Sequence, residues 1–279
     1  MALRVAGYHI VRGGFNSPLI DVNLLPDDIW DREDPMYGLE LDFDSQLAMI
    51  ERDLGSYITE FRPPLSGEST TGFYLDNPWY GPMDAHVLYA MIRRHKPRRV
   101  LELGSGFSTL IVAEALRANG ESASHEVVDP TPSTLVADVE GLQVRQESAA
   151  TANAALFDRL SSGDILFVDT SHTVKPGGEV VRVILEVLPT LAAGVIVHFH
   201  DFFRPFPYPR VLYERFNVHW QEQYLLEAFL AYNPNFRVIC ANHALWRLRR
   251  SKVLRLFPVL REGMQPSAVW LERLGTTET

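Results

Sequence analysis

From Arg98 onward, short runs rich in apolar and β-branched residues alternate with runs of helical periodicity. This alternation is typical of crossover units, in which parallel strands are covered by helices on both faces of the sheet. Strands are predicted at residues 98–104, 125–130, 142–148, 164–170 and 194–201. The helices predicted between and after them are at 108–119, 134–140, 155–160, 178–191 and 220–232.

Two further strands are predicted near the C-terminus, at 236–240 and 267–274, and a basic helical stretch at 244–256 lies between them. The sequence thus predicts an α/β fold with a seven-stranded, doubly wound sheet, made of five parallel strands and a C-terminal antiparallel pair. Residues 1–75 are rich in Pro, Gly and Asp, with one helix predicted at 44–61. We interpret them as an N-terminal helical extension that caps the active site, and residues 76–279 as the catalytic domain.

Charge and composition narrow the classes of function. Lys and Arg number 26 against 35 Asp and Glu, a net charge of −9 in 279 residues, and this disfavours nucleic acid as a partner. Cys240 is the only cysteine, so no internal disulfide forms. No segment is apolar and long enough to suggest a membrane span or a signal peptide. A cytoplasmic protein is expected, and a homo-oligomer is compatible with the sequence.

The turn after the first core strand reads Leu-Glu-Leu-Gly-Ser-Gly-Phe-Ser-Thr, and Gly104 and Gly106 lie within it. Glycines at the start of a helix let a ligand approach the backbone closely, and the free amides there favour an anionic group. Asp129 ends the second strand, where a carboxylate can accept hydrogen bonds from the two hydroxyls of a ribose. Thr109 stands where a third glycine would complete the dinucleotide fingerprint, which lowers the expectation of a nicotinamide cofactor.

With these motifs the sequence resembles class I S-adenosylmethionine-dependent methyltransferases, whose fold is a Rossmann-like sheet. The resemblance extends over roughly residues 40 to 240 and is most specific for a bacterial subfamily, methyltransferase family 24. It rests on the segments DFDSQLAMIERD, NPWYGPMDAH, LELGSGFST, VDTSHTVKPGG, VHFHDFFRPFPYP and QEQYLLEAFLAYNPNF.

The resemblance implies S-adenosylmethionine as the cofactor and assigns a role to each matching position. Gly104 and Gly106, with Ser108 beside them, would contact its methionine part, and Asp129 would hold the ribose. Glu102 would stabilise the turn or the amino group. Glu147 and Ser148, after the third strand, would border the adenine ring.

A second group of polar residues follows the fourth and fifth strands. Asp169 and His172 come after one, and His200 and Asp201 after the other. The carboxyl ends of parallel strands meet at one edge of a sheet, so these side chains are expected to lie together beside the glycine turn. Asp169, His200 and Asp201 are candidate ligands of a divalent metal ion such as Mg²⁺, Mn²⁺ or Fe²⁺, by resemblance to catechol O-methyltransferase. His172 is the predicted general base, with or without a metal.

These features predict an O-methyltransferase (EC 2.1.1.-) that acts on a small molecule such as a sugar, a polyketide or another product of secondary metabolism. A cofactor-binding protein without activity is one alternative, and a nicotinamide-dependent oxidoreductase is another. Tyr80, Asp84 and His86 are further candidates for closing the cofactor pocket, whereas His198 is expected in the core. The aromatic run 202–209 is expected either to form a wall of the acceptor site or to pack against the N-terminal extension.

Overall fold

The computed structural model describes residues 15–67, 71–120 and 122–275. Its centre is one seven-stranded sheet with the strand order β3-β2-β1-β4-β5-β7-β6. Strands β1 to β5 are parallel, and β7 is antiparallel to both β5 and β6. The seven strands are β1 (Arg99–Leu103), β2 (Ser124–Val128), β3 (Leu142–Arg145), β4 (Ile165–Val168), β5 (Ile196–Phe199), β6 (Phe236–Ala241) and β7 (Val269–Arg273). The predicted fold class is confirmed.

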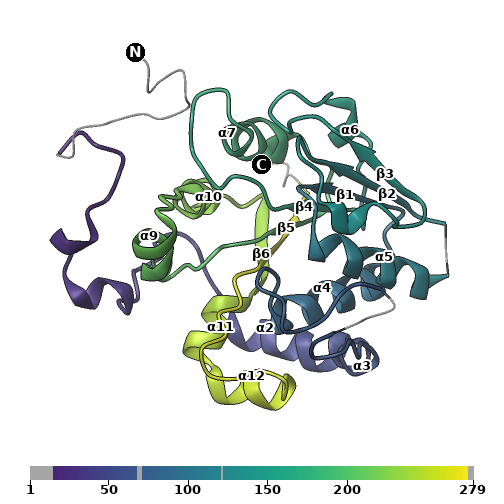
Figure 1. The fold of residues 1–279 in the computed structure, drawn as a ribbon, viewed down its shortest axis with the longest axis horizontal. Coiled ribbons are helices and arrows are strands. Elements are labelled where there is room, and N and C mark those ends of the chain that lie inside the picture. The colour runs from purple at the N-terminus through teal and green to yellow at the C-terminus, as the bar shows by residue number, and fades with distance from the viewer. Residues whose placement is uncertain (1–14, 68–70, 121, 276–279) are drawn as a thin grey trace.

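Helices cover both faces of this sheet (Figure 1). One face carries α2 (Phe43–Met49), α3 (Gly55–Glu60), α4 (Pro82–His95), α5 (Phe107–Asn119), α11 (Asn242–Leu248) and α12 (Arg250–Leu256). The other carries α6 (Ala155–Asp158), α7 (Glu179–Arg182), α8 (Leu188–Thr190) and α10 (Glu222–Leu230). Helix α9 (Arg210–Phe216) lies beside the N-terminal segment. None of the described helices is long and apolar enough to cross a membrane.

Alternation along the central strands divides the apolar residues between two cores. In β4, Ile165 and Phe167 face the α4–α5 side, and Leu166 and Val168 face the α7–α10 side. All four are fully buried, because a parallel strand covered on both faces has no solvent side. This double burial explains why the strands appear in the sequence as continuous apolar runs.

Four predicted helices differ in detail from the observed ones. Residues 134–140 form only a 3-10 turn, Thr134–Val136, because a single side chain of that turn, Val136, is buried, which is too little to hold a helix against the sheet. The stretch 244–256 is divided at Arg249 into α11 and α12. The long helices begun by α2 and α7 are continuous but each contains a π turn, at Ile50–Leu54 and Val183–Val187.

The described part of the N-terminal region, residues 15–67 and 71–75, follows two different surfaces. Helix α3 and the π turn before it pack on α4, whereas α2 lies against β6. There the Gln46 amide oxygen accepts a hydrogen bond from the backbone of Ala241 (2.9 Å). The preceding segment lies against the loop after β5, where Asp34 binds Arg204 (2.8 Å). The division of the chain at residue 75, and a capping role for the region before it, stay predictions.

Candidate active site

A cavity of about 750 Å³ opens at the carboxyl ends of β1, β2 and β4, next to the glycine turn. We call it the glycine cavity. Of the predicted cofactor contacts, the residues that line it are Gly104, Gly106, Ser108, Asp129 and Ser148. Trp79, Tyr80, Lys175 and Glu179 lie on its other sides.

Gly104 and Gly106 of the turn are glycines for different physical reasons. Gly104 has a φ of +97°, and a Cβ there would lie 1.9 Å from the carbonyl oxygen of Asp169, so the backbones at the ends of β1 and β4 come too close for any side chain. Gly106 has an extended φ of 168°, and a Cβ there would meet no atom within 4 Å. Gly104 is therefore required by the protein itself, whereas Gly106 leaves room in the cavity.

Asp129 is fixed at the edge of this cavity by its neighbours. Its Oδ2 accepts a hydrogen bond from the Ser105 hydroxyl (2.6 Å), and its Oδ1 accepts one from the backbone of Thr131 (2.8 Å). The Ser105 oxygen in turn accepts a hydrogen bond from the backbone of Ser133 (2.9 Å). The carboxylate keeps lone pairs free on the cavity side, which fits the predicted contact with a ribose.

Two predicted cofactor residues do not line the cavity. Glu102 is fully buried beneath the turn, where it binds His125 and accepts hydrogen bonds from Thr109 (3.2 Å) and Ser108 (3.4 Å). Its position fits the stabilisation of the turn, which was one of its two predicted roles. Glu147 is half-buried beside Ser148 and is not one of the residues that line the cavity. Direct contact of either residue with a cofactor stays a prediction.

The predicted metal ligands do come together. One ligand atom from each of Asp169, His200 and Asp201 lies within 4.8 Å of the others, and we call these three residues the Asp-His cluster. His200 Nδ1 is 3.7 Å from Asp169 Oδ2 and 3.6 Å from Asp201 Oδ1. The Ser267 hydroxyl donates to Asp201 Oδ1 (3.0 Å). Two carboxylates and an imidazole are a donor set that suits a divalent transition metal.

His172 lies behind this cluster and lines neither of the cavities described in this section. Its Nδ1 is 2.7 Å from Glu222 Oε2, and its Nε2 is 3.2 Å from Asp169 Oδ1 and 3.5 Å from Asp201 Oδ2. His172 and Asp201 have φ values of 54° and 57°, in the left-handed region that few residues with side chains adopt. Such strain is found preferentially at functional sites, and here it affects two members of one constellation.

The charges of His172, His200 and the neighbouring carboxylates control which of these groups hold a proton. Burial disfavours the charged imidazole of His200, but the carboxylates of Asp201 and Asp169 outweigh burial and raise the pKa of His200 to about 9. Burial opposes ionisation of Asp169 in the same way, yet His200 and His172 lower its pKa to about 2. Hydrogen bonds to Asp169 and Glu222 likewise overcome burial and raise the pKa of His172 well above its usual value. Without a metal, both imidazoles therefore hold a proton at neutral pH.

A second cavity, of about 690 Å³, lies on the other side of the Asp-His cluster, and we call it the apolar cavity. Trp79 and Tyr80 line both cavities. Asp169 lines the glycine cavity, whereas His200 and Asp201 line the apolar cavity. The cluster is therefore part of the wall between the two cavities.

Three participants were missed in the sequence. Glu222 holds His172, Ser267 holds Asp201, and Trp220 lies on the apolar cavity and against the His172 ring (4.4 Å between centroids). Glu222 and Trp220 belong to the predicted helix at 220–232, and Ser267 begins the last predicted strand. No local motif marks these residues, because they reach the site only through the tertiary fold.

The remaining candidates are divided between the site and the core. Tyr80 stacks on His200 (4.7 Å), and Asp84 lines the apolar cavity while accepting a hydrogen bond from Asn242 (2.7 Å). His86 instead binds the carbonyl of Pro82 (2.7 Å), away from both cavities. His198 is fully buried, and burial lowers its pKa to about 3.

The aromatic run after β5 fulfils parts of both predicted roles. Phe203 lines the apolar cavity, and with Tyr208 and Tyr213 it forms a small core that Val22 and Trp30 of the N-terminal region cover.

Comparison with known proteins gives one family match. Residues 101–202, from β1 to the loop after β5, match the Methyltransf_24 family, which is described as a methyltransferase domain. An uncharacterized protein of Archaeoglobus fulgidus is 29% identical over 104 residues, which are 36% of this chain and 47% of that protein. The match thus spans about half the length of that relative.

Solved structures with a similar arrangement include three with a bound cofactor or its product. The SAH-bound methyltransferase PaMTH1 of Podospora anserina is 18% identical and covers 70% of this chain and 80% of its own, with a TM-score of 0.45. The SAM complex of the O-methyltransferase TomG of Streptomyces achromogenes, involved in tomaymycin synthesis, is 14% identical and covers 85% and 91%, with a TM-score of 0.43. An SAH complex of an O-methyltransferase of Bacillus cereus is 12% identical and covers 83% and 91%, with a TM-score of 0.42.

The family match covers the glycine turn, Asp129 and the Asp-His cluster together. In residues 101–202 the chain is therefore similar to the methyltransferase domains of the Methyltransf_24 family.

Proposed function

We propose that this protein is an S-adenosylmethionine-dependent methyltransferase that methylates an oxygen atom of a small molecule. The observation that carries the proposal is the position of the Asp-His cluster between two cavities, one beside the glycine turn and one beside apolar side chains. A methyl donor and an acceptor in these cavities would meet at the cluster. The family match favours this function over a nicotinamide-dependent oxidoreductase.

The residues of the glycine cavity fit S-adenosylmethionine. Gly106 leaves open space at the start of α5, and Asp129 offers a fixed carboxylate for the ribose hydroxyls. The Thr170 hydroxyl is buried without a hydrogen-bond partner among the described residues, so a ligand in this cavity could satisfy it. When bound, the cofactor supplies a sulfonium-activated methyl group. The protein orients the two reactants, and orientation alone can lower a barrier by up to about 7–11 kcal/mol.

The Asp-His cluster is placed to receive the proton of the acceptor hydroxyl. Asp201 faces the apolar cavity, and Ser267 and His172 fix its two oxygens at 3.0 and 3.5 Å. Asp169, His200 and Asp201 would hold a divalent cation, which would supply a lowered pKa for a hydroxyl bound to it. A cation there would displace the proton that His200 otherwise holds, because an imidazole must be neutral to bind a metal.

His172 was predicted as the general base, and that role stays a prediction. We propose a positioning role instead, because both ring nitrogens face carboxylates and the raised pKa leaves no free lone pair at neutral pH. In this role the imidazole keeps Asp169 and Asp201 in place from behind, and Glu222 orients the ring.

Calorimetry tests the cofactor assignment. We expect S-adenosylhomocysteine to bind the protein, and Asp129→Ala to weaken binding by at least about tenfold, the equivalent of ~1.4 kcal/mol. Asp158→Ala, an exposed carboxylate on α6 outside both cavities, should bind like the wild type. Absence of binding to the wild type would reject the function. Binding without methyl transfer to any acceptor would favour the inactive alternative.

Titration with Mn²⁺ tests the metal. The expected result is that Mn²⁺ raises the melting temperature of the wild type and that Asp201→Asn removes this effect, because ligands that bind only the folded state stabilise it. An identical shift in both proteins would mean that the ion binds elsewhere. Full methyl transfer after treatment with a chelator would show that the cluster works without a metal.

A further inference from the structure

The geometry of the apolar cavity points to the acceptor class. We infer that it takes an uncharged, largely apolar hydroxyl compound and rejects acceptors that carry a phosphate, sulfonate or carboxylate group. This inference rests on the proposed function and narrows it, because sugars that carry a phosphate or a nucleotide are excluded.

Apolar side chains form most of the lining of the cavity. They come from the segment before α4, from α9 and its flanks, and from the segment before β7. Representative members are Leu75, Met83, Leu212, Phe216, Trp220 and Leu260. Three lining residues are large apolar side chains with high exposure, namely Trp79 (75%), Phe216 (58%) and Val211 (45%). Neighbouring exposed apolar groups are typical of a ligand site that is open to solvent.

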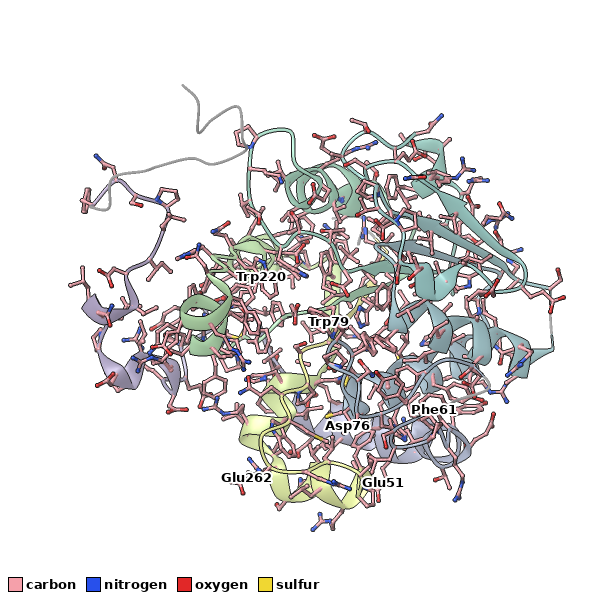
Figure 2. The ribbon with its side chains drawn as sticks, viewed as in Figure 1. Glu51, Phe61, Asp76, Trp79, Trp220 and Glu262 are labelled. Atoms are coloured by element: carbon pink, nitrogen blue, oxygen red, sulfur yellow. The ribbon has the colours of Figure 1, made fainter. Side chains whose placement is uncertain are left out.

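Aromatic rings stand at two sides of this region. Trp79 comes from the segment before α4 and Trp220 from the segment before α10, and Figure 2 labels both near the middle of the molecule. Trp220 also packs edge-on against Tyr208 (5.7 Å), so its ring is supported from behind. Rigid aromatic walls favour an apolar ligand over a heavily hydrated one.

The charged residues that line the apolar cavity restrict the class of acceptor more sharply than its apolar residues do. Among the described residues that line the apolar cavity there is no Lys or Arg, whereas Asp76, Asp84 and Asp201 all line it. Two arginines on the adjoining loop and on α9 are already paired, Arg204 with Asp34 and Glu227 and Arg210 with Asp27 and Glu214. A third, Arg215, lies over the Phe216 ring (5.6 Å) and does not line the cavity. The charge of His200, which also lines the cavity, is already balanced by Asp84, Asp169 and Asp201. An anionic acceptor would therefore meet carboxylates without an unpaired cation, and burial of an uncompensated charge is strongly unfavourable. The glycine cavity differs, since Lys175 lines it.

A matched pair of probes tests the inference. 2-Naphthol and 6-hydroxynaphthalene-2-sulfonate share the ring and the hydroxyl and differ in one anionic group. Calorimetric titration of the protein saturated with S-adenosylhomocysteine should show 2-naphthol binding at least about tenfold more tightly than the sulfonate, a difference of ~1.4 kcal/mol.

Two variants locate the binding. Phe216→Ala should weaken 2-naphthol binding by about tenfold, because truncation of a contacting aromatic residue is costly at a binding site. Its control is Tyr37→Ala, since Tyr37 is similarly exposed (74%) and lines neither cavity. Asp76→Lys should raise the affinity for the sulfonate by about tenfold through the new cation. Its control, Asp158→Lys, should leave the ratio of the two affinities unchanged.

Each outcome decides one question. Equal or tighter binding of the sulfonate, or no binding of either probe, overturns the inference. Loss of 2-naphthol affinity in Tyr37→Ala equal to that in Phe216→Ala overturns the location in the apolar cavity. Failure of S-adenosylhomocysteine to bind, with 2-naphthol still preferred over the sulfonate, rejects the proposed function and leaves only the preference of the cavity for uncharged ligands.

Discussion

The glycine cavity and the apolar cavity have similar volumes, about 750 and 690 Å³, but they are built in different ways. The first is shaped by backbone: Gly104 lies where β1 and β4 approach too closely for a side chain, and Asp129 is fixed by turn hydrogen bonds. The second is shaped by side chains from the start of α4, from α9 and from the loops after β5 and before β7. In the proposed function, the donor site is thus shaped by the sheet, and the acceptor site is shaped by the helices and loops around it.

The glycine pair provides the strongest test of that difference. Gly104→Ala places a Cβ 1.9 Å from the Asp169 carbonyl at a φ of +97°, so we expect a loss of roughly 3–5 kcal/mol of folding free energy. Gly106→Ala meets open space and should cost less than about 1 kcal/mol, while its methyl group weakens S-adenosylhomocysteine binding. Denaturant unfolding and calorimetry measure the two effects. Equal stability of the two variants would contradict the steric account.

The cluster that separates the cavities should affect turnover and leave donor binding unchanged. With any acceptor that is methylated, Asp201→Asn should slow turnover by roughly 10²–10⁴-fold, the usual contribution of acid–base groups, with an unchanged dissociation constant for S-adenosylhomocysteine. Glu262→Gln is the control, because this exposed carboxylate lies near the lower edge of the molecule in Figure 2 and lines neither cavity. A normal rate for Asp201→Asn would remove the cluster from the chemistry.

The charges around His200, in the wall between the two cavities, predict that the free energy of unfolding of the metal-free protein depends on pH. His200 has a pKa of about 9 in the folded state against about 6.5 when unfolded, so its stabilising contribution is complete below pH ~6.5 and is lost as the pH rises through 9. The difference corresponds to roughly 3 kcal/mol. Denaturant unfolding at several pH values in the presence of a chelator measures it. His200→Gln should flatten this part of the profile, and an unchanged slope in the variant would show that other groups cause it.

The smallest effect is expected at the ion pair between Asp34 and Arg204, which holds the loop after β5 beside the apolar cavity. Asp34→Ala removes one of the two carboxylates bound to Arg204 on the loop after β5, and we expect a loss of about 1 kcal/mol of stability because Glu227 remains. The same variant should weaken 2-naphthol binding severalfold and leave S-adenosylhomocysteine binding unaltered. Weakening of both ligands to the same extent would mean that the two cavities do not have separate supports.

Local signals in the sequence were sufficient for the sheet and for most of the donor side. The strands were predictable as continuous apolar runs, because strands that are buried on both faces do not alternate polar and apolar residues. The glycine turn and Asp129 were predictable because both lie within one crossover unit, β1 to β2. The acceptor side was not predictable in the same way. Its walls combine residues near 75–84, 200–220 and 260–267, and only the fold brings Ser267 to Asp201 or Glu222 to His172.

His172 shows a second kind of property that the sequence could not predict, namely the protonation state of a side chain. The sequence indicated a histidine near the chemistry, but not that three carboxylates would surround it and keep it protonated. The number of neighbouring charges depends on side chains from β4, β5 and α10 together, which spacing along the chain does not reveal.

The position of α9 and of the loop with Met264 outside the strands of the sheet has a practical consequence for engineering. A library limited to Val211, Leu212, Phe216 and Met264 would remodel the compounds that the enzyme accepts without disturbing the ladder of the sheet. Donor affinity would serve as an internal standard for every clone, separating altered selectivity from general damage.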